Sequence, residues 1–217
     1  MKLAWRSKKI PFFYKSMNFL SWIIFRFLYK FRVYGQENII SGPAIIAGNH
    51  VSYLDPPLVG TACPDEVHYL AKESLFKIPI FGFLIKKINS HPLKGTGGDF
   101  AVFKRVINLL EEGKKVILFP EGQRSYDDKL CPIKPGLSLL ISKTKAPVIP
   151  VYIFGTFKAW PRMNFLPRIG GTLGCIFGKP IYWDEFESLP KKESQIAFAD
   201  RLTKDIIDLK KKYQEIQ

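Results

Sequence analysis

The sequence predicts a single α/β domain, with a central largely parallel or mixed sheet flanked by helices, preceded by an N-terminal amphipathic helix that anchors the chain to a membrane. Short apolar runs rich in β-branched residues alternate with segments of helical apolar spacing, which predicts the sheet and its helices. The first 34 residues are aromatic and basic, which predicts the anchor. A length of 217 residues, 47% of them hydrophobic, suits one such domain with a sizeable core. We therefore divide the chain into an anchor over residues 1–34 and a domain over residues 35–217.

The N-terminal segment is too short in its uncharged part to cross a bilayer. Its longest charge-free run, residues 16–25, would span about 15 Å as a helix, whereas the hydrocarbon core is roughly 30 Å thick. Residues 1–36 contain eight basic residues and no acidic one, so they hold +8 of the formal net charge of +14. Lys15, Arg26 and Lys30 fall within about 60° on a helical wheel, beside a broad apolar face. This pattern is typical of a helix lying in the membrane interface, and a helix packed on its own domain is the alternative.

The remaining elements follow in order along the chain. Strands are predicted over four buried runs and one weaker run: 43–48, 67–71, 115–119, 148–154 and 172–177. Helices are predicted where apolar residues recur at helical spacing: 99–112, 136–144 and 191–217. Residues 73–88 are apolar almost all round, with lysines at the margins. This segment is either a core helix kinked near Pro79 and Gly82 or a second lipid-facing surface, and its pattern fits both.

Composition and residue spacing argue against several classes of protein. The three cysteines form no CxxC pair, which favours a reduced, cytosol-facing compartment. The three histidines have no ligand spacing with one another or with the cysteines, so no metal is predicted. The positive charge is concentrated beside aromatic residues, and no nucleic-acid-binding module is recognisable. We therefore expect an anionic bilayer surface, and no nucleic acid, as a partner.

The first polar string, NHVSYLDPP from Asn49, directly follows a predicted strand. His50 is therefore expected at the carboxyl end of that strand, where open α/β sheets bind ligands. Pro56 keeps Asp55 extended and starts the next helix, so the loop can turn the Asp55 carboxylate back onto the His50 imidazole, as a general base with an orienting acid. The alternative is that Asp55 only caps the helix and His50 is an incidental loop residue. Ser52 is a weaker candidate, as a nucleophile, because the chain contains no GxSxG.

Two further strings offer groups that bind phosphate. FPEGQRS, over residues 119–125, again follows a predicted strand. In it Arg124 supplies a planar fork for phosphate oxygens, and Glu121 would fix that guanidinium or accept a hydrogen bond from a substrate hydroxyl. KGTGGD, over residues 94–99, precedes a predicted helix, where backbone amides and Lys94 would form a phosphate cradle. The alternatives are a solvated turn for the first string and an ordinary flexible loop for the second.

Together these strings resemble the lysophospholipid and glycerolipid acyltransferase family, most closely the bacterial 1-acyl-sn-glycerol-3-phosphate acyltransferases. The family's NHxSxxD block is matched by residues 49–55, its FPEGxRS block by 119–125 and its later VPVxIxG-like strand by 149–155. The resemblance implies transfer of an acyl group from a thioester to the free sn-2 hydroxyl of 1-acyl-sn-glycerol 3-phosphate, which yields phosphatidic acid. The donor would be acyl-CoA or an acyl carrier protein, and no cofactor is expected.

The resemblance also assigns roles to individual residues. His50 corresponds to the catalytic base and Asp55 to its partner. Three residues correspond to the block that engages the phosphate and glycerol of the acceptor: Glu121, Gly122 and Arg124. The family's acceptor-binding arginine before the next helix falls on Gly95 in this chain. Lys94, beside it, is assigned that role, although an ammonium is a point charge and lacks the bidentate fork of arginine.

The expected location is the cytoplasmic face of the inner membrane, with residues 1–34 as a monotopic, peripheral anchor and residues 35–217 as the acyltransferase domain. An acceptor that resides in the bilayer interface accounts for a basic, aromatic anchor. Two alternatives stay open. One is an acyltransferase that acts on glycerol 3-phosphate or another lysophospholipid, and the other, from a different class, is a non-enzymatic basic membrane-binding protein.

Overall fold

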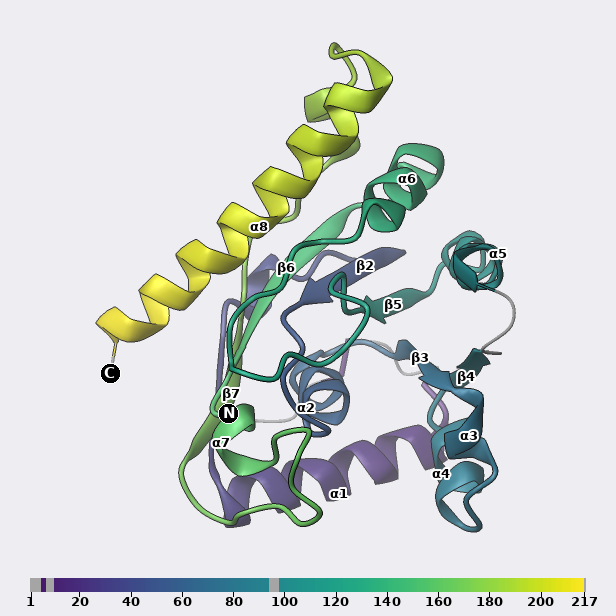
Figure 1. Cartoon of the computed structure of the whole chain (residues 1–217). Coiled ribbons are helices and arrows are strands. Elements are labelled where there is room, and N and C mark those ends of the chain that lie inside the picture. Colours follow the sequence, from purple (N-terminus) through teal and green to yellow (C-terminus); the bar gives the residue numbers. More distant parts are fainter. Residues whose placement is uncertain (1–4, 7–9, 94–97, 217) are drawn as a thin grey trace.

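The computed structural model describes residues 5–6, 10–93 and 98–216. Its centre is a seven-stranded sheet in the order β1-β7-β6-β2-β5-β3-β4 (Figure 1). The strands are β1 (Lys30–Tyr34), β2 (Ala44–Gly48), β3 (Val67–Lys72), β4 (Ser90–Leu93), β5 (Lys115–Leu118), β6 (Val148–Phe154) and β7 (Thr172–Phe177). Every neighbouring pair is parallel except β6 and β7, which are antiparallel. The predicted single α/β domain with a mixed sheet is confirmed.

Helices cover both faces of the sheet. They are α1 (Phe12–Leu28), α2 (Asp55–Ala62), α3 (Glu73–Phe76), α4 (Phe81–Lys87), α5 (Gly98–Glu111), α6 (Pro135–Thr144), α7 (Thr156–Ala159) and α8 (Lys191–Glu215). Two 3₁₀ turns, Gln36–Asn38 and Trp183–Phe186, complete the regular structure of the described residues. The predicted helices over 99–112, 136–144 and 191–217 correspond to α5, α6 and α8.

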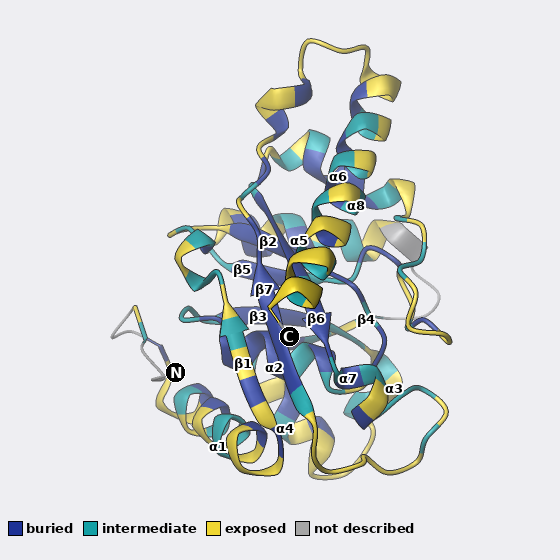
Figure 2. Cartoon of the chain, turned by 90° about the vertical axis from the view of Figure 1, so that its left-hand side faces the viewer, coloured by how far each residue is buried: buried dark blue, intermediate teal, exposed yellow. Residues whose placement is uncertain are grey.

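Strand β2 contributes side chains to the cores on both faces of the sheet. All five of its residues are buried, and successive side chains point to opposite faces. Ile46 belongs to the core cluster that contains residues of α1 and α2, whereas Ile45 belongs to the cluster that contains residues of α5, α6 and α8. A strand buried on both faces is consistent with a central position in a parallel sheet. The sheet is accordingly the most deeply buried part of the chain in Figure 2.

The N-terminal segment differs from its predicted form at its C-terminal end. Helix α1 ends at Leu28, and residues 30–34 form β1, which pairs with β7. Tyr29 and Phe31, expected on the helix, lie beyond it and are buried. The boundary drawn at residue 34 therefore follows a strand of the domain's own sheet. The helix pattern was misleading there because strand pairing with β7, far along the chain, overrides the local propensity.

Helix α1 packs on the domain along one side only. Asn18 donates from Nδ2 to the carbonyl of Gly60 in α2 at 3.1 Å, and the buried Tyr14 hydroxyl accepts from the amide of Val67 at 3.1 Å. The other side of α1 leaves apolar side chains exposed: Phe12, Phe13, Phe19, Leu20, Ile24, Phe27 and Leu28. Among the described residues, no helix is both long and apolar enough to cross a bilayer.

Residues 73–88 form two short helices, α3 and α4, instead of one kinked core helix. Between them Ile80 adopts a φ of 62°, in the left-handed region that a β-branched residue rarely occupies. Ile85 is buried, but Ile78, Ile80, Phe81 and Phe83 are exposed. The core alternative is therefore wrong for most of this segment.

Candidate active site

The two loops predicted to carry the chemistry leave the sheet side by side. Strand β2 pairs in parallel with β5 on one side and with β6 on the other. The chain runs from β2 to β3, on the far side of β5, and from β5 to β6, on the far side of β2, so these two connections lead in opposite directions (Figure 1). The carboxyl ends of parallel strands meet at one edge, and the point of divergence is where such sheets bind ligands. Residues 49–55 follow β2 at that edge, and residues 119–125 follow β5.

Asn49 fixes the start of the first loop. Its side-chain amide forms two hydrogen bonds with the backbone of Ile153 in β6, because Nδ2 donates to the carbonyl at 3.0 Å and Oδ1 accepts from the amide at 2.7 Å. Ser52 is fully buried, and its hydroxyl donates to the carbonyl of Trp160 at 2.6 Å. A hydroxyl used in this way is unsuited to be a nucleophile, in agreement with its low rank in the sequence.

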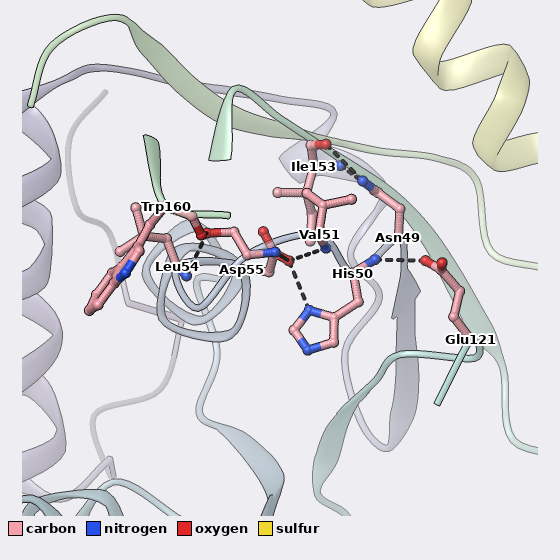
Figure 3. Close-up of polar contacts among 9 residues, drawn as sticks. Asn49, His50, Val51, Leu54, Asp55, Glu121, Ile153 and Trp160 are labelled. Atoms are coloured by element: carbon pink, nitrogen blue, oxygen red, sulfur yellow. Dashed lines mark hydrogen bonds and ion pairs between the residues drawn. The ribbon is translucent and has the colours of Figure 1, made fainter. Parts of the chain in front are cut away.

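His50 and Asp55 form the contact that the loop predicts. Nδ1 of His50 lies 2.8 Å from Oδ2 of the fully buried Asp55 (Figure 3). The same oxygen accepts from the amides of Val51 and Ser52, both at 2.7 Å. The carboxylate thus faces back onto the loop, and no side chain caps α2. The alternative that Asp55 is only a helix cap is therefore wrong.

A carboxylate at Nδ1 determines the tautomer of His50. The hydrogen of a neutral imidazole is placed on Nδ1, so Nε2 carries the lone pair. Figure 3 shows Nε2 on the side of the ring away from Asp55. The ring also stacks on Phe119, with centroids 4.0 Å apart and planes 16° apart, and 17% of the side chain is exposed. The imidazole is held in orientation while one nitrogen stays available as a proton acceptor.

Glu121 holds the backbone of the His50 loop. It is buried, and its Oε1 accepts from the amide of His50 at 2.7 Å (Figure 3). Its Oε2 accepts from the amide of Cys131 at 2.9 Å. The amide of Ser125 also donates to the carbonyl of His50 at 2.8 Å. Burial raises the pKa of the Glu121 carboxyl, and the two amide donors oppose that shift. The expected contact between Glu121 and the Arg124 guanidinium is absent among the described residues, and the carboxylate is bonded to the two backbone amides instead.

Arg124 lies against the first loop. Its guanidinium carbon is 3.5 Å from the ring centroid of Tyr53, which is within the range of a cation–π contact. Its Nη1 is buried and has no hydrogen-bond partner among the described residues. A buried guanidinium N–H without an acceptor fits an anionic oxygen of a ligand. Gly122, in the turn before it, has a φ of +70°, which favours glycine at this position.

The structure thus brings together His50, Asp55, Glu121, Gly122 and Arg124, while Lys94 lies outside the described residues. Sequence reasoning missed two aromatic members of the site. Tyr53 stands inside the first string but was given no role, and Trp160, whose ring centroid is 5.2 Å from that of Tyr53, is more than 100 residues away in the chain. Only the tertiary fold makes Trp160 a neighbour of this loop.

Comparisons with known proteins agree with the resemblance. A family model described as "Acyltransferase" matches residues 30–154, more than half of the chain. A 1-acyl-sn-glycerol-3-phosphate acyltransferase of Bacillus subtilis is 29% identical over 187 residues, covering 85% of this chain and 90% of the relative. A chloroplastic protein of the same description from Brassica napus is 32% identical over 165 residues, but this chain spans only 48% of its length.

A solved structure extends the likeness to three dimensions. The crystal structure of the 1-acyl-sn-glycerophosphate acyltransferase of Thermotoga maritima superposes with a TM-score of 0.69 and 27% identity, over 88% of this chain and 78% of that one. The fold, the two loops at one sheet edge and the family match all agree. The chain belongs to the acyltransferase family and is an acyltransferase.

Proposed function

We propose that the enzyme transfers an acyl group from a thioester, acyl-CoA or acyl carrier protein, to the sn-2 hydroxyl of 1-acyl-sn-glycerol 3-phosphate, forming phosphatidic acid for phospholipid biosynthesis. The observation that carries the proposal is the contact of His50 with Asp55, on a loop that also holds the Arg124 guanidinium. The names of the relatives in Bacillus subtilis, Brassica napus and Thermotoga maritima support the acceptor.

The chemistry requires a base because an alcohol does not ionise near neutral pH. Nε2 of His50 would take the hydroxyl proton as the oxygen attacks the thioester carbonyl, and the carboxylate of Asp55 would stabilise the imidazolium that forms. The new C–O bond forms, the C–S bond breaks, and the proton passes from His50 to the departing thiolate. A thiolate leaves readily, so the step needs no acyl-enzyme and no cofactor.

The acceptor's phosphate would bind at Arg124. The guanidinium presents two parallel N–H groups to a phosphate, and its Nη1 has no other acceptor among the described residues. Glu121 would act on the reaction through the backbone of His50, and Gly122 would let the loop turn close to the glycerol. Lys94 is proposed as a second cation for the phosphate on sequence grounds alone.

We also propose that the enzyme lies on the cytoplasmic face of the inner membrane as a monotopic protein, with α1 as its anchor. The exposed side of α1 is apolar, and Arg26 in its last turn is basic. Helix α4 lies at the same end of the molecule (Figure 2). Its exposed Phe81 and Phe83 are followed in the chain by Lys86 and Lys87. Apolar side chains bordered by cations suit an anionic bilayer surface.

The purified protein can be assayed with labelled acyl-CoA and labelled acyl carrier protein against lysophosphatidic acid, other lysophospholipids and glycerol 3-phosphate. We expect phosphatidic acid from lysophosphatidic acid, and a loss of about 10³-fold or more in kcat for His50→Ala. Vesicle binding should be unchanged in this variant, because it removes none of the exposed apolar side chains of α1. Undiminished turnover in His50→Ala would reject the mechanism, and turnover confined to glycerol 3-phosphate would reject the acceptor.

A further inference from the structure

The loop between α7 and β7 exposes more apolar surface than its surroundings explain. Within residues 162–170, here called the 162–170 loop, four apolar side chains are strongly exposed: Met163, Phe165, Leu166 and Ile169. Phe165 is 91% exposed, the highest value for any large apolar side chain described. Soluble surfaces rarely gather such residues in one short segment, and clusters of this kind mark contact sites.

The charge of this segment is entirely positive. No acidic residue occurs between Asp128 and Asp184. Arg162 precedes Met163, and Arg168 stands between Leu166 and Ile169. Arginine and lysine side chains lay their aliphatic stems on apolar surface while the charged group stays at a polar boundary. An apolar tip between cations therefore matches the boundary between lipid tails and anionic headgroups.

Backbone hydrogen bonds attach the loop to the proposed anchor. The amide of Gly170 donates to the carbonyl of Leu28, the last residue of α1, at 3.0 Å, and the amide of Lys30 donates to the carbonyl of Gly171 at 2.8 Å. In Figures 1 and 2 the loop, α1 and α4 together form the lower end of the molecule. The loop thus ends beside the C-terminal end of α1, where Phe27 is 79% exposed.

The other end of the loop is attached to the active site. The carbonyl of Trp160 accepts from the Ser52 hydroxyl at 2.6 Å, and Pro161 forms a β-bridge with Ser52. The Trp160 ring lies against the Tyr53 ring, and the Arg124 guanidinium stacks on that Tyr53 ring. A single segment therefore connects the end of α1 with the loop that bears His50 and Asp55.

We propose that the 162–170 loop inserts into an anionic phospholipid bilayer and holds the His50 site against the membrane surface from which a lipid acceptor arrives. This inference rests on the membrane location proposed above and adds a second, separate insertion element to α1. Phe165 and Leu166 would enter the acyl region, and Arg162 and Arg168 would stay at the headgroups. The partner is the bilayer itself, because the exposed tip is apolar and its border carries only positive charge.

The first test is vesicle sedimentation with phosphatidylcholine containing roughly one third phosphatidylglycerol. Phe165→Ser/Leu166→Ser should weaken binding about tenfold to 100-fold, since two large side chains no longer enter lipid. The matched control is Ile196→Ser/Ile207→Ser, which removes two exposed apolar side chains from α8, 54% and 40% exposed. The control should bind as the unmodified protein does, and equal binding of both double variants would overturn the proposal.

A companion variant separates this proposal from the anchor. Phe12→Ser/Phe27→Ser removes exposed side chains of α1 without touching β1. If this variant loses binding and the loop variant does not, only the loop proposal fails. If neither variant loses binding, the membrane location fails as well. Turnover with a water-soluble short-chain acceptor should be unchanged in the loop variant. If the unmodified protein shows no turnover, the proposed function fails, independently of the loop.

Insertion can also be measured directly. Phe165→Trp places an indole at the tip, and its signal is obtained by subtracting the four native tryptophans of the unmodified protein. We expect a blue-shifted emission and strong quenching by lipids brominated along the acyl chain. An unquenched Trp in vesicle-bound protein would overturn the proposal. So would a loss of acyl-carrier-dependent turnover with intact vesicle binding in the loop variant, because that result identifies the loop as a protein-docking site.

Discussion

Two histidine clusters in this molecule use similar contacts to opposite effect. At the sheet edge, His50 contacts a carboxylate through Nδ1 at 2.8 Å. Within the domain, Nδ1 of His68 in β3 lies 2.9 Å from Nε2 of His91 in β4, and Arg105 in α5 contacts Nδ1 of His91 at 2.7 Å. The two clusters differ in the group that contacts Nδ1 of the histidine. For His50 it is the Asp55 carboxylate, which accepts a hydrogen bond, and for His91 it is the Arg105 guanidinium, which donates one.

That partner decides which nitrogen can accept a proton. Arginine only donates, so Nδ1 of His91 accepts and Nε2 of His91 carries the hydrogen. That Nε2 donates to Nδ1 of His68. The hydrogen of His68 is therefore on its own Nε2, which is buried. No lone pair in this cluster remains available. Burial, more than any neighbouring charge, lowers the pKa of His68 to about 3 and that of His91 to about 4. A histidine becomes a usable base here only where a carboxylate fixes one nitrogen and leaves the other open.

The largest expected effect comes from removing the charge of Asp55. All three donors converge on Oδ2, and Oδ1 is buried without a partner among the described residues. In Asp55→Asn the amide oxygen can therefore replace Oδ2 and keep the geometry, while the charge that stabilises the imidazolium is lost. We expect kcat to fall about 10²- to 10⁴-fold, measured at saturating acceptor.

Folding is the control for this variant. Near-ultraviolet circular dichroism and the thermal midpoint should stay close to those of the unmodified enzyme, because no hydrogen bond to the loop is broken. Nearly full activity in Asp55→Asn would show that the carboxylate only positions the imidazole, and the contrast between the two histidine clusters would then reduce to geometry.

The next effect tests whether Glu121 binds substrate or positions His50. Both its oxygens accept backbone amides, so Glu121→Gln places an NH₂ group against one donor and leaves that amide of His50 or Cys131 unpaired. We expect a loss of about 1–3 kcal/mol in the free energy of unfolding and a fall of up to about 100-fold in kcat, since the base is displaced. The KM for the acceptor should be unchanged. A raised KM with normal kcat would instead restore the substrate-binding role predicted from the sequence.

A smaller effect is expected at Arg124. Lysine keeps the charge but loses the planar fork and the stacking on Tyr53. Arg124→Lys should raise the KM for a phosphate-bearing acceptor about tenfold, which corresponds to about 1.4 kcal/mol, with kcat little changed. The matched control is Arg201→Lys on α8, where the guanidinium pairs with Asp205 and Glu185 on a different surface. An equal KM in both variants would argue that Arg124 is structural.

The elements that sequence alone predicts well are those whose pattern matches their burial. Strands β6 and β7 appear at the predicted residues because both are apolar runs buried in the sheet. Strand β1, KFRVY, was missed because its residues continue the basic and aromatic pattern of α1, and only pairing with β7 makes it a strand. Strand β4 is four residues long and contains Pro92, which weakens any strand signal.

The site divides in the same way. The contact of Asp55 with His50 was predicted correctly, and both residues lie in one short string of the sequence. The extended conformation expected of Asp55 before Pro56 was wrong, because Asp55 is the first residue of α2. The partners of Glu121 could not, because they are backbone amides, which leave no mark in the sequence. The stacking of Arg124 on Tyr53 likewise depends on how the loops after β2 and β5 meet. Contacts within one short stretch of the chain can be predicted from the sequence, whereas contacts between separate loops cannot.

The smallest expected effect falls on the buried histidine cluster and concerns stability alone. An unfolded histidine has a pKa of about 6.5, whereas that of folded His68 is lowered to about 3. At a pH between these two pKa values, His68 is protonated in the unfolded chain but not in the folded chain. The free energy of unfolding therefore falls as the pH falls, by about 1.4 kcal/mol per pH unit for each such histidine, and is insensitive to this group above the unfolded pKa.

His68→Gln isolates this contribution, because the amide oxygen of glutamine can still accept from His91. Urea unfolding at several pH values between neutrality and pH of about 4 should show a shallower loss of stability in the variant, by about 1.4 kcal/mol per pH unit, while acyl transfer at neutral pH is unchanged. Equal slopes would mean that His68 is protonated in the folded state. Loss of acyl transfer with an unchanged slope would mean that His68 serves the reaction, as His50 does. That result would contradict the view that this buried cluster acts on stability alone.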